Sequence, residues 1–272
     1  MRKNSKTSLL VGLSMMAFMI NIDYSAVNLA LVTIANDVHS SIATIQWILS
    51  GYVLAWAAII IPSGKLADVV GQRTMCIGGL IVFMIASVLA GLAASALMII
   101  AARLLQGVSG AMFVPTLYTL IFSNFPQEKR GFAMGMLCLG VGAGAALGPT
   151  FGGVILHNFG WPWIFFINVP ITCVAMWMIM TSTSQGDING SMRSAIHPSA
   201  ILLSLALLSV MYGIDQLDTL FSSSVSYLLA GLILAAAFAI WQSALSNPII
   251  PLSLFRNRQF VGCKLAFTIE QF

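Results

Sequence analysis

The sequence predicts an all-α polytopic membrane protein. Only 7% of the 272 residues are charged and 59% are hydrophobic, whereas a soluble domain is about one-quarter charged. Eight acids and twelve bases cannot cover a soluble surface of this size. The apolar runs are long and continuous, without the ten-residue alternation of membrane β-strands, so they indicate helices that cross a bilayer.

Eight complete spans and the start of a ninth are expected. The first run contains Asp23 and is not followed by a small-x-small cleavage site, so it indicates an uncleaved helix rather than a signal peptide. The ninth span begins near residue 260. The complete spans cover residues 8–32, 43–63, 74–95, 97–122, 131–156, 162–181, 199–217 and 225–245.

Basic residues support this count and give an orientation. Of the twelve Lys and Arg residues, all but Arg103 precede the first span or fall in loops on the same side of the membrane. Basic loops stay in the cytoplasm, which predicts a cytoplasmic N-terminus. The net charge of +4 is spread over these loops and does not indicate nucleic acid as a partner.

Enzyme and cofactor motifs are missing from the sequence. The cysteines 76, 138, 173 and 263 are far apart and form no C-x-x-C pair, so neither a disulfide framework nor a metal site is expected. No H-E-x-x-H, G-x-S-x-G or Walker motif occurs. The expected loops are too short to hold a nucleotide-binding domain. The sequence therefore predicts neither an enzyme nor an ATP-driven pump.

Polar residues concentrate in the stretch SGKLADVVGQR, residues 63–73, between the second and third spans. Gly64 and Gly71 allow tight turns of the backbone. Asp68 can accept hydrogen bonds from a helix N-terminus, or pair with Arg73 or another base. On these residues alone, an ordinary solvated loop explains the stretch equally well.

Two charged residues lie inside predicted spans. A charge at mid-membrane depth costs at least about 2.5–3.5 kcal/mol, so Arg103 must face a cavity or a partner. It serves either proton coupling or cavity electrostatics, or it is a structural tether to a carbonyl or to Gln106. Asp23, near the middle of the first span, is suited to loading and releasing a proton. The alternative is a permanent structural pair between an aspartate and an arginine.

Glycines are regularly spaced in the fifth span. Gly140, Gly144, Gly148 and Gly152 recur every four residues and form one smooth stripe. Such a stripe lets two helices approach closely in a membrane. Pro149 removes one backbone donor and is expected to bend the helix.

Three of these stretches, in order, resemble motifs of the major facilitator superfamily. GKLADVVGQR resembles the motif G-x-L-A-D-R-x-G-R-[RK] through Gly64, Leu66, Ala67, Asp68, Gly71 and Arg73. RLLQGVSGA resembles R-x-x-x-G-x-[GA] through Arg103, Gln106, Gly107 and Gly110. GMLCLGVGAGAALGPTFGG resembles the antiporter signature through Gly135, Gly144, Gly148, Pro149, Gly152 and Gly153.

Further motifs resemble the fourteen-helix drug:proton antiporters of that superfamily, the multidrug efflux type. DYSAVNLALVTIA matches their first-helix motif through Asp23, Val27, Asn28, Ala30 and Leu31. WPWIFFINVPI matches a second motif, with Pro162 in place of an arginine, and NPIIPLSLFRNRQF matches a third. The resemblance covers essentially the whole chain.

The resemblance implies a major-facilitator-type helical bundle. It places an N-terminal six-helix bundle at 1–182, a cytoplasmic linker at 183–198 and two additional helices at 199–245. A cytoplasmic loop and a truncated ninth helix occupy 246–272. The second half of the bundle would start at the ninth helix. A chain that stops there is expected to need a C-terminal half as partner, and to leave Arg103 and the glycine stripe facing lipid.

The resemblance also implies a function. It indicates a secondary active transporter of the bacterial cytoplasmic membrane that exports amphipathic, often cationic, drugs by alternating access. The proton gradient would supply the energy, without a cofactor. Exporters of a specific metabolite and a non-transporting remnant remain open alternatives. The residues implied are Asp23, Asn28, Arg103 and Gln106 for proton coupling or the cavity, Gly64, Asp68, Gly71 and Arg73 for a cytoplasmic latch, and Gly144, Gly148, Pro149, Gly152 and Gly153 for the antiporter-motif helix.

Overall fold

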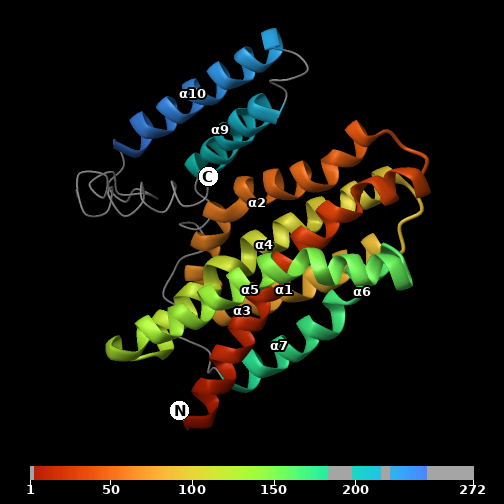
Figure 1. Cartoon of the computed structure of the whole chain (residues 1–272). Helices are drawn as coiled ribbons and strands as arrows, with labels where there is room; N and C mark the ends of the chain where they lie inside the picture. Colours follow the sequence, from red (N-terminus) through yellow and green to blue (C-terminus); the bar gives the residue numbers. More distant parts are fainter. Residues whose placement is uncertain (1–2, 183–197, 216–220, 244–272) are drawn as a thin grey trace. The chain divides into compact units, whose positions relative to one another are not determined.

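The computed structural model describes residues 3–182, 198–215 and 221–243, and Figure 1 shows the chain. Over these ranges the regular structure consists of α-helices and contains no strand, which confirms the predicted all-α class. The chain divides into two compact units, Met1–Ile196 and His197–Phe272.

The first unit contains the helices that were expected as spans one to six. Its helices are α1 Lys3–Asp37, α2 Ile42–Val70, α3 Gln72–Gly91, α4 Ala96–Asn124, α5 Gln127–Phe159, α6 Pro162–Phe166 and α7 Asn168–Ser182. Five of them, α1 to α5, are each long and apolar enough to cross a membrane. The short α6 and α7 together form the sixth such segment, Pro162–Ser182.

The second unit contains α9, Pro198–Asp215, and α10, Phe221–Ser243, packed against one another. The segment Ser224–Ser243 is long enough to cross a membrane, and among the residues whose side chains are described α9 contributes the apolar segment Leu202–Ile214. The predicted linker at 183–198, apart from Pro198, and the segment predicted at 246–272 lie outside the described residues.

Side-chain caps explain where several helices begin. The Ser41 hydroxyl accepts a hydrogen bond from the Thr44 amide (3.1 Å) at the start of α2. The Ser95 hydroxyl accepts one from the Met98 amide (3.4 Å) at the start of α4. These bonds satisfy amides that have no partner within the helix. The Trp161 indole donates to the Asp37 carboxylate (2.8 Å) and joins the entry of α6 to the end of α1.

The polar stretch between the second and third spans is not the loop that was expected. α2 continues to Val70 and α3 begins at Gln72, so Gly71 is the one residue between them. Gly71 has φ +93°, which favours glycine, and this turn is as predicted. Gly64 lies inside α2, so the predicted turn there is wrong. The charged residues of the stretch are compatible with a helix, which therefore extends beyond the apolar run.

α1 packs along α5 through the predicted glycine stripe. A β-carbon at Gly140 would lie 2.5 Å from the Ser14 carbonyl oxygen, and one at Gly152 would lie 2.8 Å from the Ala26 α-carbon. Gly144 and Gly148 make equally close approaches, to the Phe18 carbonyl and to the Ser25 side chain. The stripe is therefore covered inside the first unit, and the expectation that it faces lipid is wrong.

The first unit has two apolar cores, each shared by several helices. One lies toward the N-terminal end of α1 and includes Leu13, Phe83 and Phe113. The other lies toward the opposite end of α1 and includes Ile34 and Phe165. Along α1, the first core ends at Ile20 and the second begins at Ala26, and the charged Asp23 falls between them.

Candidate functional site

A layer of buried polar side chains separates the two apolar cores of the first unit. It contains Asp23 on α1, Ser87 on α3, Arg103 and Gln106 on α4, and Asn168 at the start of α7. Each of these side chains is at most 1% exposed. A polar group without partners is costly to bury, so the contacts among these residues decide whether the layer is stable.

The centre of the polar layer is an ion pair. Arg103 Nη1 lies 2.6 Å from Asp23 Oδ2, with both side chains fully buried. Arg103 was expected to face lipid in a chain of this length, and that expectation is wrong because the first unit encloses it. Removing either partner would leave an uncompensated charge in an apolar surrounding.

Arg103 makes further contacts that hold its guanidinium in one orientation. Its Nε donates to the Ile48 carbonyl (3.2 Å), and Nη1 also donates to Gln106 Oε1 (2.8 Å). The guanidinium carbon lies 4.3 Å from the centre of the Tyr52 ring, a favourable cation–π distance. Gly107 permits this arrangement, because a β-carbon there would overlap the Tyr52 carbonyl oxygen.

The second oxygen of Asp23 also has a partner. Asn168 Nδ2 donates to Asp23 Oδ1 at 2.7 Å, so each carboxylate oxygen accepts a hydrogen bond from a different helix. Gln106 Nε2 continues the chain of bonds to the Ser87 hydroxyl at 2.8 Å. Sequence reasoning placed Asp23, Arg103 and Gln106 at this site but missed the other two. Asn168 was visible within the WPWIFFINVPI motif, whereas Ser87 carries no sequence signal.

Three polar atoms around the ion pair are buried without a hydrogen-bond partner among the described residues. They are Arg103 Nη2, the Tyr52 hydroxyl and Asn168 Oδ1. Buried polar atoms in native proteins usually have partners, so unpaired ones need an explanation. Here a spare donor, a spare hydroxyl and a spare acceptor accompany the one buried carboxylate, and they could form new bonds if its protonation changed.

Asn28 lies apart from the polar layer. It is exposed, whereas Asp23 on the same helix is buried. Five residues along an α-helix correspond to a rotation of about 140° from the starting face, which explains the separation. The structure thus brings together three of the four residues predicted for proton coupling or the cavity, and not Asn28.

The predicted latch residues lie at the end of the bundle where α2 ends and α3 begins. Gln72 Nε2 donates to Asp68 Oδ1 (3.0 Å), and its Oε1 accepts from the Thr119 hydroxyl (2.8 Å) on α4. Arg73 donates to the Met180 carbonyl (2.8 Å) at the end of α7, rather than to Asp68. The family motif has a basic residue at position 72. Here Gln72 takes that place and donates the hydrogen bond to Asp68.

The antiporter-motif residues of α5 fall into two groups. Gly144, Gly148 and Gly152 are buried against α1. Gly153 is half-buried with only Leu29 nearby, and Pro149 is exposed within an uninterrupted helix. No group of three or more His, Cys, Asp or Glu side chains that could hold a metal occurs in the part of the chain that the structure describes.

These features define an integral membrane protein built as a helical bundle. In the part of the chain that the structure describes, seven helical segments are apolar enough to span a bilayer, and a neutralised charged layer is buried within the larger unit. The chain belongs to the Major Facilitator Superfamily, whose family model matches residues 13–263. The chain therefore belongs to a family of transporters and not of enzymes, and the family resemblance of the motifs is confirmed.

Relatives with known names support the same assignment. The chain is 33% identical over 259 residues to the multidrug export protein EmrB of Escherichia coli K12, covering 93% of the chain and 50% of that protein. It is 32% identical over 256 residues to the tetracenomycin C resistance and export protein of Streptomyces glaucescens, covering 91% and 47%. The chain thus spans about half the length of these relatives.

Solved transporter structures share the fold. A bacterial homologue of the human lysosomal transporter Spinster, in an inward-facing unoccupied conformation, matches 89% of the chain and 62% of its own with a TM-score of 0.61 at 21% identity. The peptide-transporter-family protein PepTSo matches 88% of the chain and 52% of its own with a TM-score of 0.65 at 13% identity. At these identities the matches establish the fold alone.

Proposed function

We propose that this chain forms the N-terminal portion of a proton-coupled exporter of amphipathic, often cationic, drugs in a bacterial cytoplasmic membrane. The observation that carries the proposal is the buried ion pair of Asp23 and Arg103, which shares the polar layer with Ser87, Gln106 and Asn168. A buried charge pair contributes little net stability, so its presence in a membrane bundle favours a functional role. The drug-export names of the relatives support the same conclusion.

Asp23 is the proposed proton site. In the observed arrangement it is a carboxylate that accepts from Arg103 and from Asn168 Nδ2. A protonated Asp23 would have a hydroxyl that needs an acceptor. Rotation of the Asn168 amide by half a turn would present Oδ1, which has no partner among the described residues, in place of Nδ2. Asn168 is thus proposed as a positioning residue that accommodates both protonation states.

Arg103 is the proposed counter-charge. When Asp23 takes up a proton, the guanidinium loses its anionic partner but keeps the Ile48 carbonyl, Gln106 and the face of the Tyr52 ring. These neutral contacts stabilise the cation less well than a carboxylate does. The protonated state is therefore expected to favour a different arrangement of the helices around α4, which is what coupling requires.

A second candidate function is the export of one specific metabolite. Two relatives of similar identity carry names that refer to single antibiotics: the tetracenomycin C resistance and export protein, and the methylenomycin A resistance protein of Bacillus subtilis, which is 32% identical over 271 residues. Resistance to a panel of unrelated cationic dyes and drugs separates the two. A broad panel favours the multidrug exporter, and protection against a single compound favours the metabolite exporter.

The complete transport cycle is proposed to need a second helical bundle, because alternating access moves one half against the other around a central site. The 272 residues expressed alone in an efflux-deficient bacterium should therefore give no drug resistance, and co-expression with a C-terminal half should restore some. Resistance from the lone chain at normal abundance would overturn this view.

The proposed orientation has its own test. A cysteine introduced in place of Lys129 should react only with reagents that enter the cytoplasm, whereas one in place of Asp37 should react from outside the cell. The positions lie at opposite ends of the bundle, on α5 and α1. Labelling of position 129 from outside would contradict the cytoplasmic N-terminus.

The decisive experiment for coupling uses a fusion protein in which a C-terminal helical bundle of the same family follows this chain. Everted membrane vesicles are given a pH gradient, and uptake of a cationic dye is measured. Asp23→Asn should abolish gradient-driven uptake, because an amide cannot exchange protons. Asp37→Asn, on the same helix but outside the polar layer, is the matched control and should retain it. Normal uptake by Asp23→Asn would refute the assigned proton site.

A further inference from the structure

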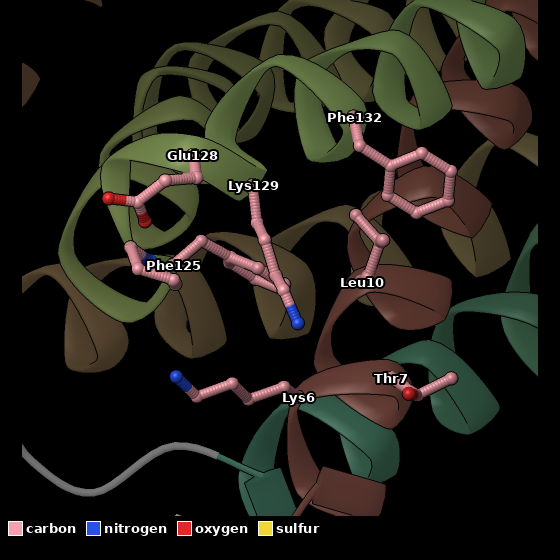
Figure 2. Close-up of a pocket in the computed structure, with 8 residues that line it drawn as sticks. Lys6, Thr7, Leu10, Phe125, Glu128, Lys129 and Phe132 are labelled. Carbon is pink, nitrogen blue, oxygen red and sulfur yellow. The ribbon is translucent and has the colours of Figure 1, made fainter.

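A pocket separate from the polar layer lies at the basic end of the first unit, between the start of α1 and the turn that joins α4 to α5 (Figure 2). Its volume is about 380 Å³, within the range of roughly 300–1,000 Å³ that is typical of ligand pockets. It is lined by Lys6, Thr7, Leu10, Phe125, Pro126, Glu128, Lys129 and Phe132.

The pocket is positively charged. Figure 2 shows Lys6 extending from α1 and Lys129 from α5, while the Glu128 carboxylate is directed away from both ammonium groups. Over the described ranges the one ion pair is that of Arg103 with Asp23, so Glu128 forms no ion pair with either lysine, and the two lysines outnumber it. The N-terminus of α5 also lies here without a side-chain cap and adds its partial positive charge. The combination favours a ligand with a compact anionic group.

The wall of the pocket beside the lysines is apolar. Leu10 and Phe125 are buried and form its inner surface, whereas the Phe132 ring is 70% exposed. Phe132 follows Lys129 by one helical turn on α5, in the direction of the membrane-spanning part of the helix. A ligand that satisfies both features has an anionic head at the lysines and an apolar chain along Phe132.

We propose that this pocket binds the phosphate headgroup of an anionic phospholipid. Lys6 and Lys129 would contact the phosphate, and Leu10 and Phe132 the first part of an acyl chain. Basic pockets between transmembrane helices at the cytoplasmic surface are suited to such headgroups. Inorganic phosphate shares the anionic chemistry but has no apolar part, so it would leave the Phe132 surface uncovered.

The experiment measures lipid binding to the purified 272-residue chain in a neutral detergent by native mass spectrometry. Phosphatidylglycerol, phosphatidylcholine with the same acyl chains, and inorganic phosphate are the probes. Phosphatidylglycerol should bind tightest. Lys6→Gln and Lys129→Gln should each weaken it about fivefold, equivalent to roughly 1 kcal/mol per lysine, and the double variant more than tenfold. Lys65→Gln, at the same end of the bundle but outside the pocket, should change affinity less than twofold.

Two further variants are informative. One distinguishes the loss of the lysine charges from misfolding, and the other distinguishes a lipid site from a site for free anions. Arginine at both positions 6 and 129 keeps the charge and should retain binding if the double glutamine variant loses it. Phe132→Ser should weaken a long-chain phosphatidylglycerol more than its dihexanoyl analogue. An equal loss in Lys65→Gln, equal binding of phosphatidylcholine, or displacement of the lipid by equimolar inorganic phosphate would each overturn the proposal.

Discussion

The polar layer and the latch region use the same kinds of side chain in opposite surroundings. In the polar layer Asp23, Arg103 and Gln106 form bonds of 2.6–2.8 Å and are at most 1% exposed. In the latch region the Asp68–Gln72 bond (3.0 Å) and the Arg73–Met180 carbonyl bond (2.8 Å) are solvent-exposed, although Arg73 is half-buried and its Nε has no partner among the described residues. The bond lengths are similar, so the surroundings, rather than the geometry, distinguish the two sites.

Solvent exposure determines what each set of contacts can do. Water competes for exposed polar groups, and an exposed charged contact is worth about 0–1 kcal/mol, so it can break and re-form during a cycle. A buried charge has no such replacement, and its contacts persist until its protonation state changes. The comparison therefore supports the proposal that the polar layer carries coupling, and it is consistent with a reversible contact at the predicted latch.

The largest difference between the two sites should appear on removing an arginine. Arg103→Leu should lower the free energy of unfolding by about 3–5 kcal/mol, because Asp23 is left charged and buried. Arg73→Leu should cost about 1 kcal/mol or less, because its partner is an exposed carbonyl. Detergent titration of each purified variant followed by circular dichroism measures both.

A double substitution checks the reason for that difference. Asp23→Leu combined with Arg103→Leu should recover much of the lost stability, because an apolar pair replaces an ion pair at little cost. Equal losses for the single variants at positions 103 and 73 would show that burial does not separate the two sites.

An intermediate effect is expected at Asn168. Asn168→Leu removes the donor to Asp23 Oδ1 and should cost about 1–3 kcal/mol, the penalty for leaving a buried acceptor unsatisfied. Asn158→Leu is the matched control, because Asn158 is exposed and donates to the Val154 carbonyl of its own helix. Its cost should stay within about 0.5 kcal/mol. The same detergent titration measures both free energies of unfolding. Similar losses at positions 168 and 158 would show that Asn168 is not part of the polar layer's bonding.

The smallest effect on stability is expected at Asp68. Asp68→Asn can still accept from Gln72, so the free energy of unfolding should change by less than about 0.5 kcal/mol. In a version with a second bundle, however, drug efflux should fall, because the latch loses its negative charge. Efflux from cells and abundance in the membrane are measured together, with Glu128→Gln as a charge-matched control. Unchanged efflux would reduce the latch to an ordinary solvated surface.

Sequence reasoning predicted those parts of the structure that local patterns determine. Hydropathy located the six spans of the first unit, and the four-residue period predicted the close packing of α5. It failed where the outcome depends on distant residues. Ser87 is ordinary in sequence and joins the site only because α3 packs on α4. Asn28 matches a family motif but lies on another face of α1.

The extent of α2 shows a different kind of failure. Polar composition between two apolar runs predicts a loop, yet the backbone of residues 64–70 remains helical and a single glycine makes the turn. Hydropathy reports where a helix leaves the apolar part of the membrane, not where it ends. The glycine signal at position 71 was sufficient to place the turn, whereas the same signal at position 64 was misleading.

The glycine contact between α1 and α5 has a mechanical consequence. The backbones meet with no side chain between them at four successive turns of α5, so a larger residue at any of these glycines would force the two helices apart. The approaches of Gly148 to the Ile22 α-carbon and to the Ser25 side chain lie on either side of Asp23 in the chain. A change in the separation of α1 and α5 would therefore also displace the proposed proton site.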